Sequence, residues 1–65
     1  MRPLVWQDVK DLVSVAQEED SPIVGWDRKF VFSIVYNYKG IEQLSAKQLT
    51  QLERLVVAHV TGDVD

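Results

Sequence analysis

Few side chains in this sequence could carry out chemistry. His59 is the single histidine, and cysteine is absent. The chain therefore cannot form disulfides, a thiolate nucleophile or a multi-histidine or cysteine-ligated metal site. Helical spacing places Leu55 and Val56 beside His59, and neither side chain can orient an imidazole for proton transfer. We expect a partly buried structural histidine, no metal or cofactor, and no enzymatic activity.

The carboxylates form a run rather than a pair suited to acid–base catalysis. Glu18, Glu19 and Asp20 are consecutive, as is common in a solvated loop at the end of a helix. The alternative is an acidic patch that binds a basic partner. The formal net charge of −3, from 7 basic and 10 acidic residues, argues against general nucleic-acid binding.

The strongest functional signal is the aromatic and basic content of residues 26–39. At about 100° per residue, a helix over this segment places the following residues on one side, which we predict to be its core side: Trp26, Phe30, Ile34 and Tyr38. The other side then presents a second set, which we predict to bind a partner: Arg28, Lys29, Phe32, Tyr36 and Lys39. Aromatic rings flanked by cations are typical of protein-interface hot spots. They also suit stacking on single-stranded bases.

Three segments have helical periodicity. Apolar residues recur at three- and four-residue spacing from Val5 to Ala16, and the pair at 21–22, serine then proline, should end this first helix. The second segment, 26–38, could instead be a strand, because residues 30–36 are rich in strand formers. Its four-residue spacing extends beyond that run and favours a helix, with Gly40 as a left-handed residue after its end.

The third segment has the clearest start. Ser45 and Gln48 have the spacing of a capping box, and an apolar stripe continues from Leu49 to Val60. We expect this helix to end at residues 61–62 and residues 63–65 to fray.

Residues 26–55 also contain a longer pattern, Trp26-x-x-x-Phe30-x-x-Ser33-Ile34 followed by Leu44-Ser45-x-Lys47-Gln48-x-x-x-Leu52-x-x-Leu55. It resembles a short helical-hairpin segment of phage and mobile-element proteins, many of which handle DNA. In that segment the first helix carries the Trp and Phe, and the Leu-Ser-x-Lys-Gln turn opens the second. The resemblance implies a helical second segment, a phage or mobile-element origin and a context in DNA metabolism.

Together these patterns predict one all-α domain over residues 1–65. We expect three helices, the second and third forming an antiparallel hairpin and the first packing across it. No apolar run reaches the roughly 20 residues of a membrane span, and the N-terminal apolar stretch is too short for a signal peptide, so we expect a cytoplasmic protein. The predicted function is non-enzymatic interaction: binding to a protein partner such as a host factor, or self-association into a homo-oligomer. The alternative is a nucleic-acid-binding module that uses the aromatic and basic side of the second helix.

Overall fold

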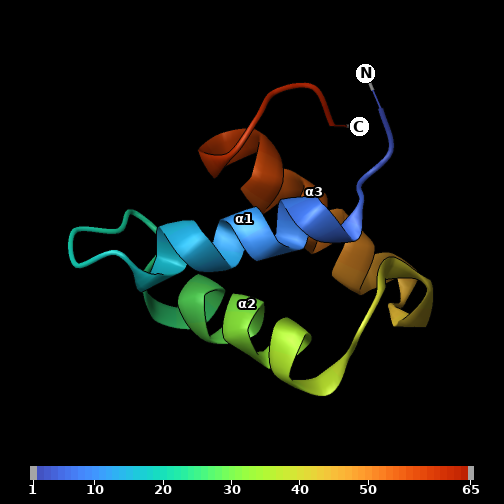
Figure 1. The fold of residues 1–65 in the computed structure, drawn as a ribbon, viewed down its shortest axis with the longest axis horizontal. Coiled ribbons are helices and arrows are strands. Elements are labelled where there is room, and N and C mark those ends of the chain that lie inside the picture. Colours follow the sequence, from blue (N-terminus) through green and yellow to red (C-terminus); the bar gives the residue numbers. More distant parts are fainter. Residues whose placement is uncertain (1, 65) are drawn as a thin grey trace.

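The computed structural model describes residues 2–64, so residues 1 and 65 of the predicted domain lie outside the described part. Within it are three α-helices and one short 3₁₀-helix: α1 (Trp6–Gln17), α2 (Gly25–Asn37), η1 (Ile41–Gln43) and α3 (Ala46–His59). Figure 1 shows their arrangement. The predicted all-α, three-helix class is confirmed, and the second segment is a helix rather than a strand. None of the helices within residues 2–64 has the length and apolar character that a membrane crossing requires.

Helix α1 lies at the centre of the fold and packs against both other helices. Helices α1 and α2 run side by side in opposite directions, joined by the loop of residues 18–24, whereas α3 crosses behind α1 (Figure 1). The antiparallel hairpin is therefore formed by α1 and α2, and its assignment to the second and third helices was wrong. The connection from α2 to α3 explains the difference. Tyr38, Gly40 and Leu44 are extended, and the chain is carried away from α2 before α3 begins.

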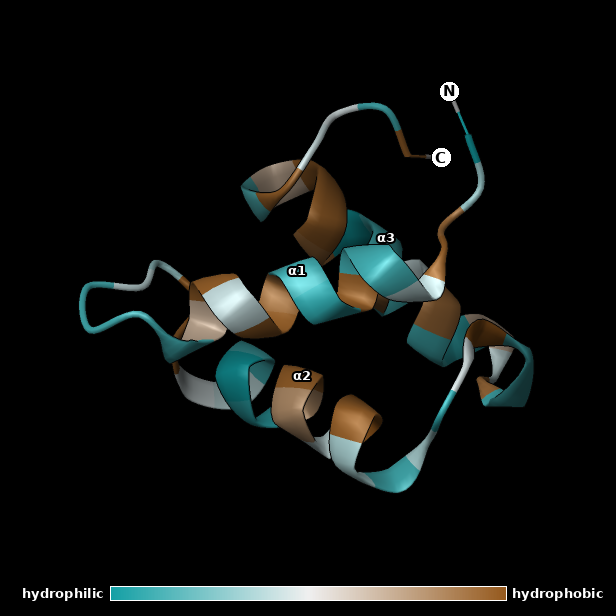
Figure 2. Ribbon diagram, viewed as in Figure 1, coloured by the Kyte–Doolittle hydropathy of each residue, from teal (hydrophilic) through white to brown (hydrophobic). Residues whose placement is uncertain are grey.

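The core is built from small and medium aliphatic side chains. Hydrophobic and hydrophilic segments alternate along α1 and α3 (Figure 2), as expected of helices with one buried side. The buried apolar residues come from all three helices, the first loop and both chain ends: Leu4, Val9, Leu12, Ala16, Ile23, Val31, Ile34, Leu52, Leu55, Val56 and Val64.

The start of α3 follows the predicted capping box. The Gln48 N–H donates to Ser45 Oγ at 3.2 Å, and the Ser45 N–H donates to Gln48 Oε1 at 2.8 Å. Two N–H groups that the first turn would otherwise leave without partners are thereby satisfied. The helix ends at His59, two residues before the expected position, and the Thr61 N–H bonds the Val56 carbonyl at 2.9 Å.

The left-handed glycine is Gly25, not Gly40. Gly25 has φ +61° where the loop enters α2, a conformation that side chains rarely adopt. Gly40 is extended, with φ −168°, because α2 already ends in an extended residue at Tyr38. A Cβ atom at Gly40 would lie 2.6 Å from the Glu42 carboxylate, so the exposed Glu42 side chain would have to move if another residue stood there.

The two ends of the chain lie beside each other (Figure 1). The Arg2 N–H donates to the Asp63 carbonyl at 2.7 Å, and Arg2 forms a parallel bridge with Val64. The expected fraying is therefore wrong for residues 63 and 64, while residue 65 lies outside the described residues. The physical reason is that Val64 is buried in the same apolar cluster as Leu4, so the C-terminal segment contributes to the core.

Candidate interaction surface

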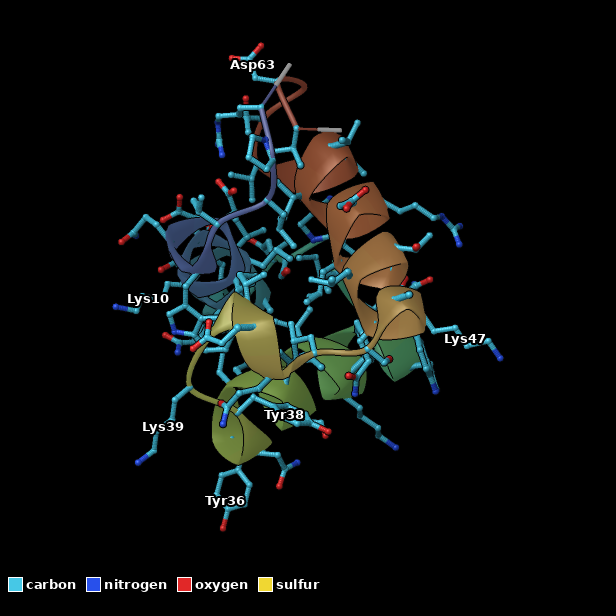
Figure 3. The ribbon with its side chains drawn as sticks, turned by 90° about the vertical axis from the view of Figure 1, so that its right-hand side faces the viewer. Lys10, Tyr36, Tyr38, Lys39, Lys47 and Asp63 are labelled. Carbon is cyan, nitrogen blue, oxygen red and sulfur yellow. The ribbon has the colours of Figure 1, made fainter. Side chains whose placement is uncertain are left out.

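The residues predicted to bind a partner lie on or just beyond α2. We call them the α2 surface, and define it as Arg28, Lys29, Phe32, Tyr36 and Lys39. The first four line one shallow groove together with Ser33, Val35 and Asn37. Lys39 lies outside that groove, two residues past the helix, and extends into solvent on the same side of the molecule as Tyr36 (Figure 3).

Arg28 and Phe32 form a fixed pair within this surface. The Arg28 guanidinium lies over the Phe32 ring, with Cζ 4.8 Å from the ring centroid. The Arg28 Nε–H also donates to the Ala16 carbonyl of α1 at 3.2 Å. Phe32 is half-buried and packs against the core, so it does not point wholly away from it as the helical spacing had suggested. The pair therefore has both a structural role and an accessible cationic edge.

Tyr36 is the more exposed of the two aromatic side chains of the α2 surface. It is 89% exposed in the last part of α2, and Figure 3 shows its ring extending away from the body of the molecule. The sequence predicted this exposure. An aromatic ring in this position buries almost nothing within the monomer and keeps nearly its whole apolar face available.

A second aromatic surface was not predicted. Trp26 is 64% exposed, and its ring stacks on Phe30 with centroids 5.0 Å apart and planes 10° from parallel. These rings face the first half of α3 across a mainly apolar groove, which we call the Trp26 groove. It is lined by Trp26, Phe30, Ala46, Lys47, Gln48, Thr50 and Gln51.

The prediction that Trp26 occupies the core was wrong, whereas Phe30 is half-buried and packs against the core, in part as predicted. Residues four apart advance about 40° more than a full turn, so a row of them winds around the helix. The buried side of α2 is instead the pair Val31 and Ile34, and Trp26 lies at the far end of the winding row. Tyr38, at the other end, is half-buried and its hydroxyl accepts a 3.4 Å hydrogen bond from Gln48 Nε2.

One ion pair was missed by the sequence analysis. The Arg2 guanidinium binds Asp8 through both carboxylate oxygens, with Nη1–Oδ2 at 2.8 Å and Nη2–Oδ1 at 2.7 Å. Asp8 is only 3% exposed and also accepts from the Val5 N–H at 2.9 Å. The hydrogen bond from Arg2 lowers the pKa of Asp8 below its ordinary 3.8, against the opposing effect of burial. The sequence does contain a signal for this contact. Asp8 is the third residue of α1, and Val5, the residue before the helix, has no side chain that could cap it.

This ion pair has a structural role. The Asp8 carboxylate also accepts from the N–H of Val5, the residue just before α1, and so holds the entry to the helix in place. The ion pair also fixes the N-terminal segment that pairs with the C-terminal one. Asp8 is buried and its carboxylate is already bound by Arg2 and the Val5 N–H, so we assign it no part in binding.

The other chemistry-bearing residues lie in two different parts of the fold, the end of α3 and the loop between α1 and α2. His59 is half-buried in the last turn of α3, as expected of a structural histidine. Glu18, Glu19 and Asp20 are exposed in the α1–α2 loop. Across residues 2–64, no group of three or more histidine, aspartate or glutamate side chains is arranged so that it could hold a metal ion.

Comparisons with known proteins found no relative. No family model matches the chain, and neither curated proteins nor solved structures gave a significant match. The function must therefore be argued from the two aromatic surfaces themselves.

Proposed function

We propose that this chain is a small, non-enzymatic interaction protein that binds a protein partner through the α2 surface. The observation that carries the proposal is Tyr36, which is 89% exposed beside the fixed Arg28–Phe32 pair. Tyrosine and arginine are enriched among the residues that contribute most to protein–protein binding. A tyrosine so exposed contributes little to the fold, and binding is the role that its position supports best.

The geometry of Arg28 supports the same function. Its Nε–H is held by the Ala16 carbonyl and its plane by the Phe32 ring, so its rotamer is set before a partner arrives. A preorganised side chain loses less conformational entropy on binding than a free one. Arg28 can still offer its terminal N–H groups to a carboxylate or carbonyl of the partner.

The test is partner capture with single-residue variants. Immobilised wild-type protein, Tyr36→Ala and a control, Lys10→Ala, are incubated with lysate of the organism that encodes the chain. Lys10 is exposed on α1 and lies away from Tyr36 in Figure 3. We expect proteins that are retained by wild type and Lys10→Ala and lost by Tyr36→Ala, while the helical circular dichroism of all three stays equal. If all three immobilised proteins retained the same lysate proteins equally, the α2 surface would not be the binding site.

Nucleic-acid binding is the second candidate, favoured by the presence of Arg28, Lys29 and two rings in one groove. Bases could stack on Tyr36 while the cations contact phosphates. The test is the fluorescence anisotropy of a labelled single-stranded DNA of mixed sequence, titrated at several salt concentrations. Binding by this mode should weaken steeply with salt and be lost in Lys29→Ala, whereas an apolar protein interface should be nearly salt-independent.

A phage or mobile-element origin stays a prediction of the pattern at residues 26–55. A role in DNA metabolism and a cytoplasmic site of action stay predictions in the same way. If the nucleic-acid candidate fails the anisotropy test, a DNA-related role would have to act through a protein partner.

A further inference from the structure

The Trp26 groove is an apolar surface with a basic edge. Its floor is the Trp26–Phe30 stack, and its other wall is the exposed side of the first turns of α3. Lys47 supplies the charge in that wall, and Figure 3 shows its side chain extending into solvent. A ligand for this groove should therefore combine an apolar contact with negative charge.

The α1–α2 loop of the same chain has that combination. Glu18, Glu19 and Asp20 are all exposed, and Val24 at the end of the loop is 65% exposed. The loop is held in shape by Ile23, which is buried and whose N–H donates to Ser21 Oγ at 3.1 Å.

The positions of these two features suit a two-fold dimer. The loop lies at one end of the molecule and the start of α3 at the other (Figure 1). A two-fold axis near the Trp26–Phe30 stack, which lies between the loop and the start of α3, would therefore place the loop of each copy against the start of α3 of the other. Both contacts form at once in such an arrangement, which closes at two copies and does not continue into a filament.

We propose that the chain forms this symmetric dimer. In it, the two Trp26–Phe30 stacks pack together near the axis, and Glu18, Glu19 and Asp20 of each copy face Lys47 of the other. The occupant of the groove is thus a second copy of the chain. The interface uses neither Tyr36 nor Lys39, so the α2 surface stays free for the partner of the proposed function, and the two proposals can fail independently.

The first test is sedimentation velocity from micromolar to millimolar protein concentration. We expect wild type to shift from monomer to dimer and Trp26→Ala to raise the dimer dissociation constant at least about 30-fold, the equivalent of about 2 kcal/mol. Tyr36→Ala is the matched control, an exposed aromatic of the same helix, and should dimerise as wild type does. Circular dichroism on the same samples verifies that each variant is folded.

The second test reverses the charges of the proposed contact between Glu19 and Lys47. It does not require that Trp26→Ala is folded. Glu19→Lys and Lys47→Glu change exposed side chains, and each should weaken its own dimer roughly tenfold, because the two-fold axis repeats each altered contact. In an equimolar mixture of the two variants, every lysine faces a glutamate in the mixed dimer. We therefore expect the mixture to recover an affinity close to that of wild type.

Three results would overturn the proposal. The first is wild-type protein that is monomeric at every concentration. The second is a dimer that Trp26→Ala leaves unchanged or that Tyr36→Ala abolishes, which would place association on the α2 surface. The third is a mixture of Glu19→Lys and Lys47→Glu that dimerises no better than either variant alone.

Discussion

Helices α1 and α2 differ in how far the predicted core side is the buried side. In α1, Val9, Leu12 and Ala16 of the predicted side are fully buried, and the larger Trp6 is half-buried against the same core. In α2 the residue predicted to anchor the core, Trp26, is largely exposed, and the burial falls on Val31 and Ile34.

The difference follows from the number of neighbours. Helix α1 lies between α2 and α3, so an apolar stripe of any residue type is covered from two directions. Helix α2 packs closely against α1 alone among the described helices, and the buried strip of Val31 and Ile34 fills that contact. Phe30 and Phe32 lie against the edge of the core, whereas Trp26 and Tyr36 are mostly exposed and are the rings left for binding.

The largest expected effect tests the α1 half of this contrast. Leu12→Ala should destabilise the fold by about 2–5 kcal/mol, because it removes a fully buried side chain and leaves a cavity at the centre of the core. In a domain of this size that is a large share of the total stability. Urea denaturation followed by circular dichroism measures it, with Val24→Ala as an exposed aliphatic control. Equal midpoints for the two variants would contradict the central position of α1.

Asp8→Asn should have the next largest effect. Near neutral pH the loss should be about 1–3 kcal/mol, which is less than the roughly 3–5 kcal/mol that breaking a fully buried ion pair costs, because Arg2 is partly solvated. Glu19→Gln, a change in an exposed carboxylate, is the control and should leave the urea midpoint unchanged.

The same variant should change the response to acid. Because the pKa of Asp8 is lowered by folding, its stabilisation is complete above the ordinary value of 3.8 and is lost as the pH falls through the folded-state pKa. The stability difference between wild type and Asp8→Asn should therefore shrink as the pH is lowered below about 4. Melting temperatures measured from neutral pH down to pH 2 test this, and a constant difference over that range would rule out the linkage.

Ser45→Ala should cost about 1 kcal/mol, the usual effect of losing a side-chain cap at the start of a helix. Ser14→Ala, in the exposed middle of α1, provides the control, because it removes a hydroxyl without removing a cap. The comparison of their thermal midpoints isolates the cap. An unchanged midpoint for Ser45→Ala would mean that α3 does not depend on it.

Trp26→Ala should have the smallest effect and tests the α2 half of the contrast. The indole is mostly exposed, so its loss should cost no more than its stacking on Phe30, about 0.5–1.5 kcal/mol. A buried ring would cost about 3–5 kcal/mol. Chemical denaturation at a concentration low enough to keep the protein monomeric distinguishes the two. A loss of about 3–5 kcal/mol would show that Trp26 belongs to the core and would contradict the exposed Trp26 groove.

Part of the interaction surface could be predicted from the helical repeat alone. That repeat placed Tyr36 away from the core, and Tyr36 is exposed. It could not separate Phe32 from Tyr36, because Phe32 is half-buried by packing against a core that all three helices build. It also could not predict the Trp26 groove, since the other wall of that groove comes from α3, some twenty residues further along the chain.

What the sequence determined by itself is the local structure: three helices, the capping box of Ser45 and Gln48, and the exclusion of cysteine and multi-histidine chemistry. These depend on residues within one or two helical turns, or on composition. Only the tertiary structure decided which helix is central, which rings stay exposed, and that Arg2 binds Asp8 while the chain ends pair. Those outcomes depend on how three rigid helices pack around one small core. When one apolar strip of a helix is buried there, another strip stays in solvent. Which strip is buried depends on the neighbouring helices, and no local sequence pattern encodes it.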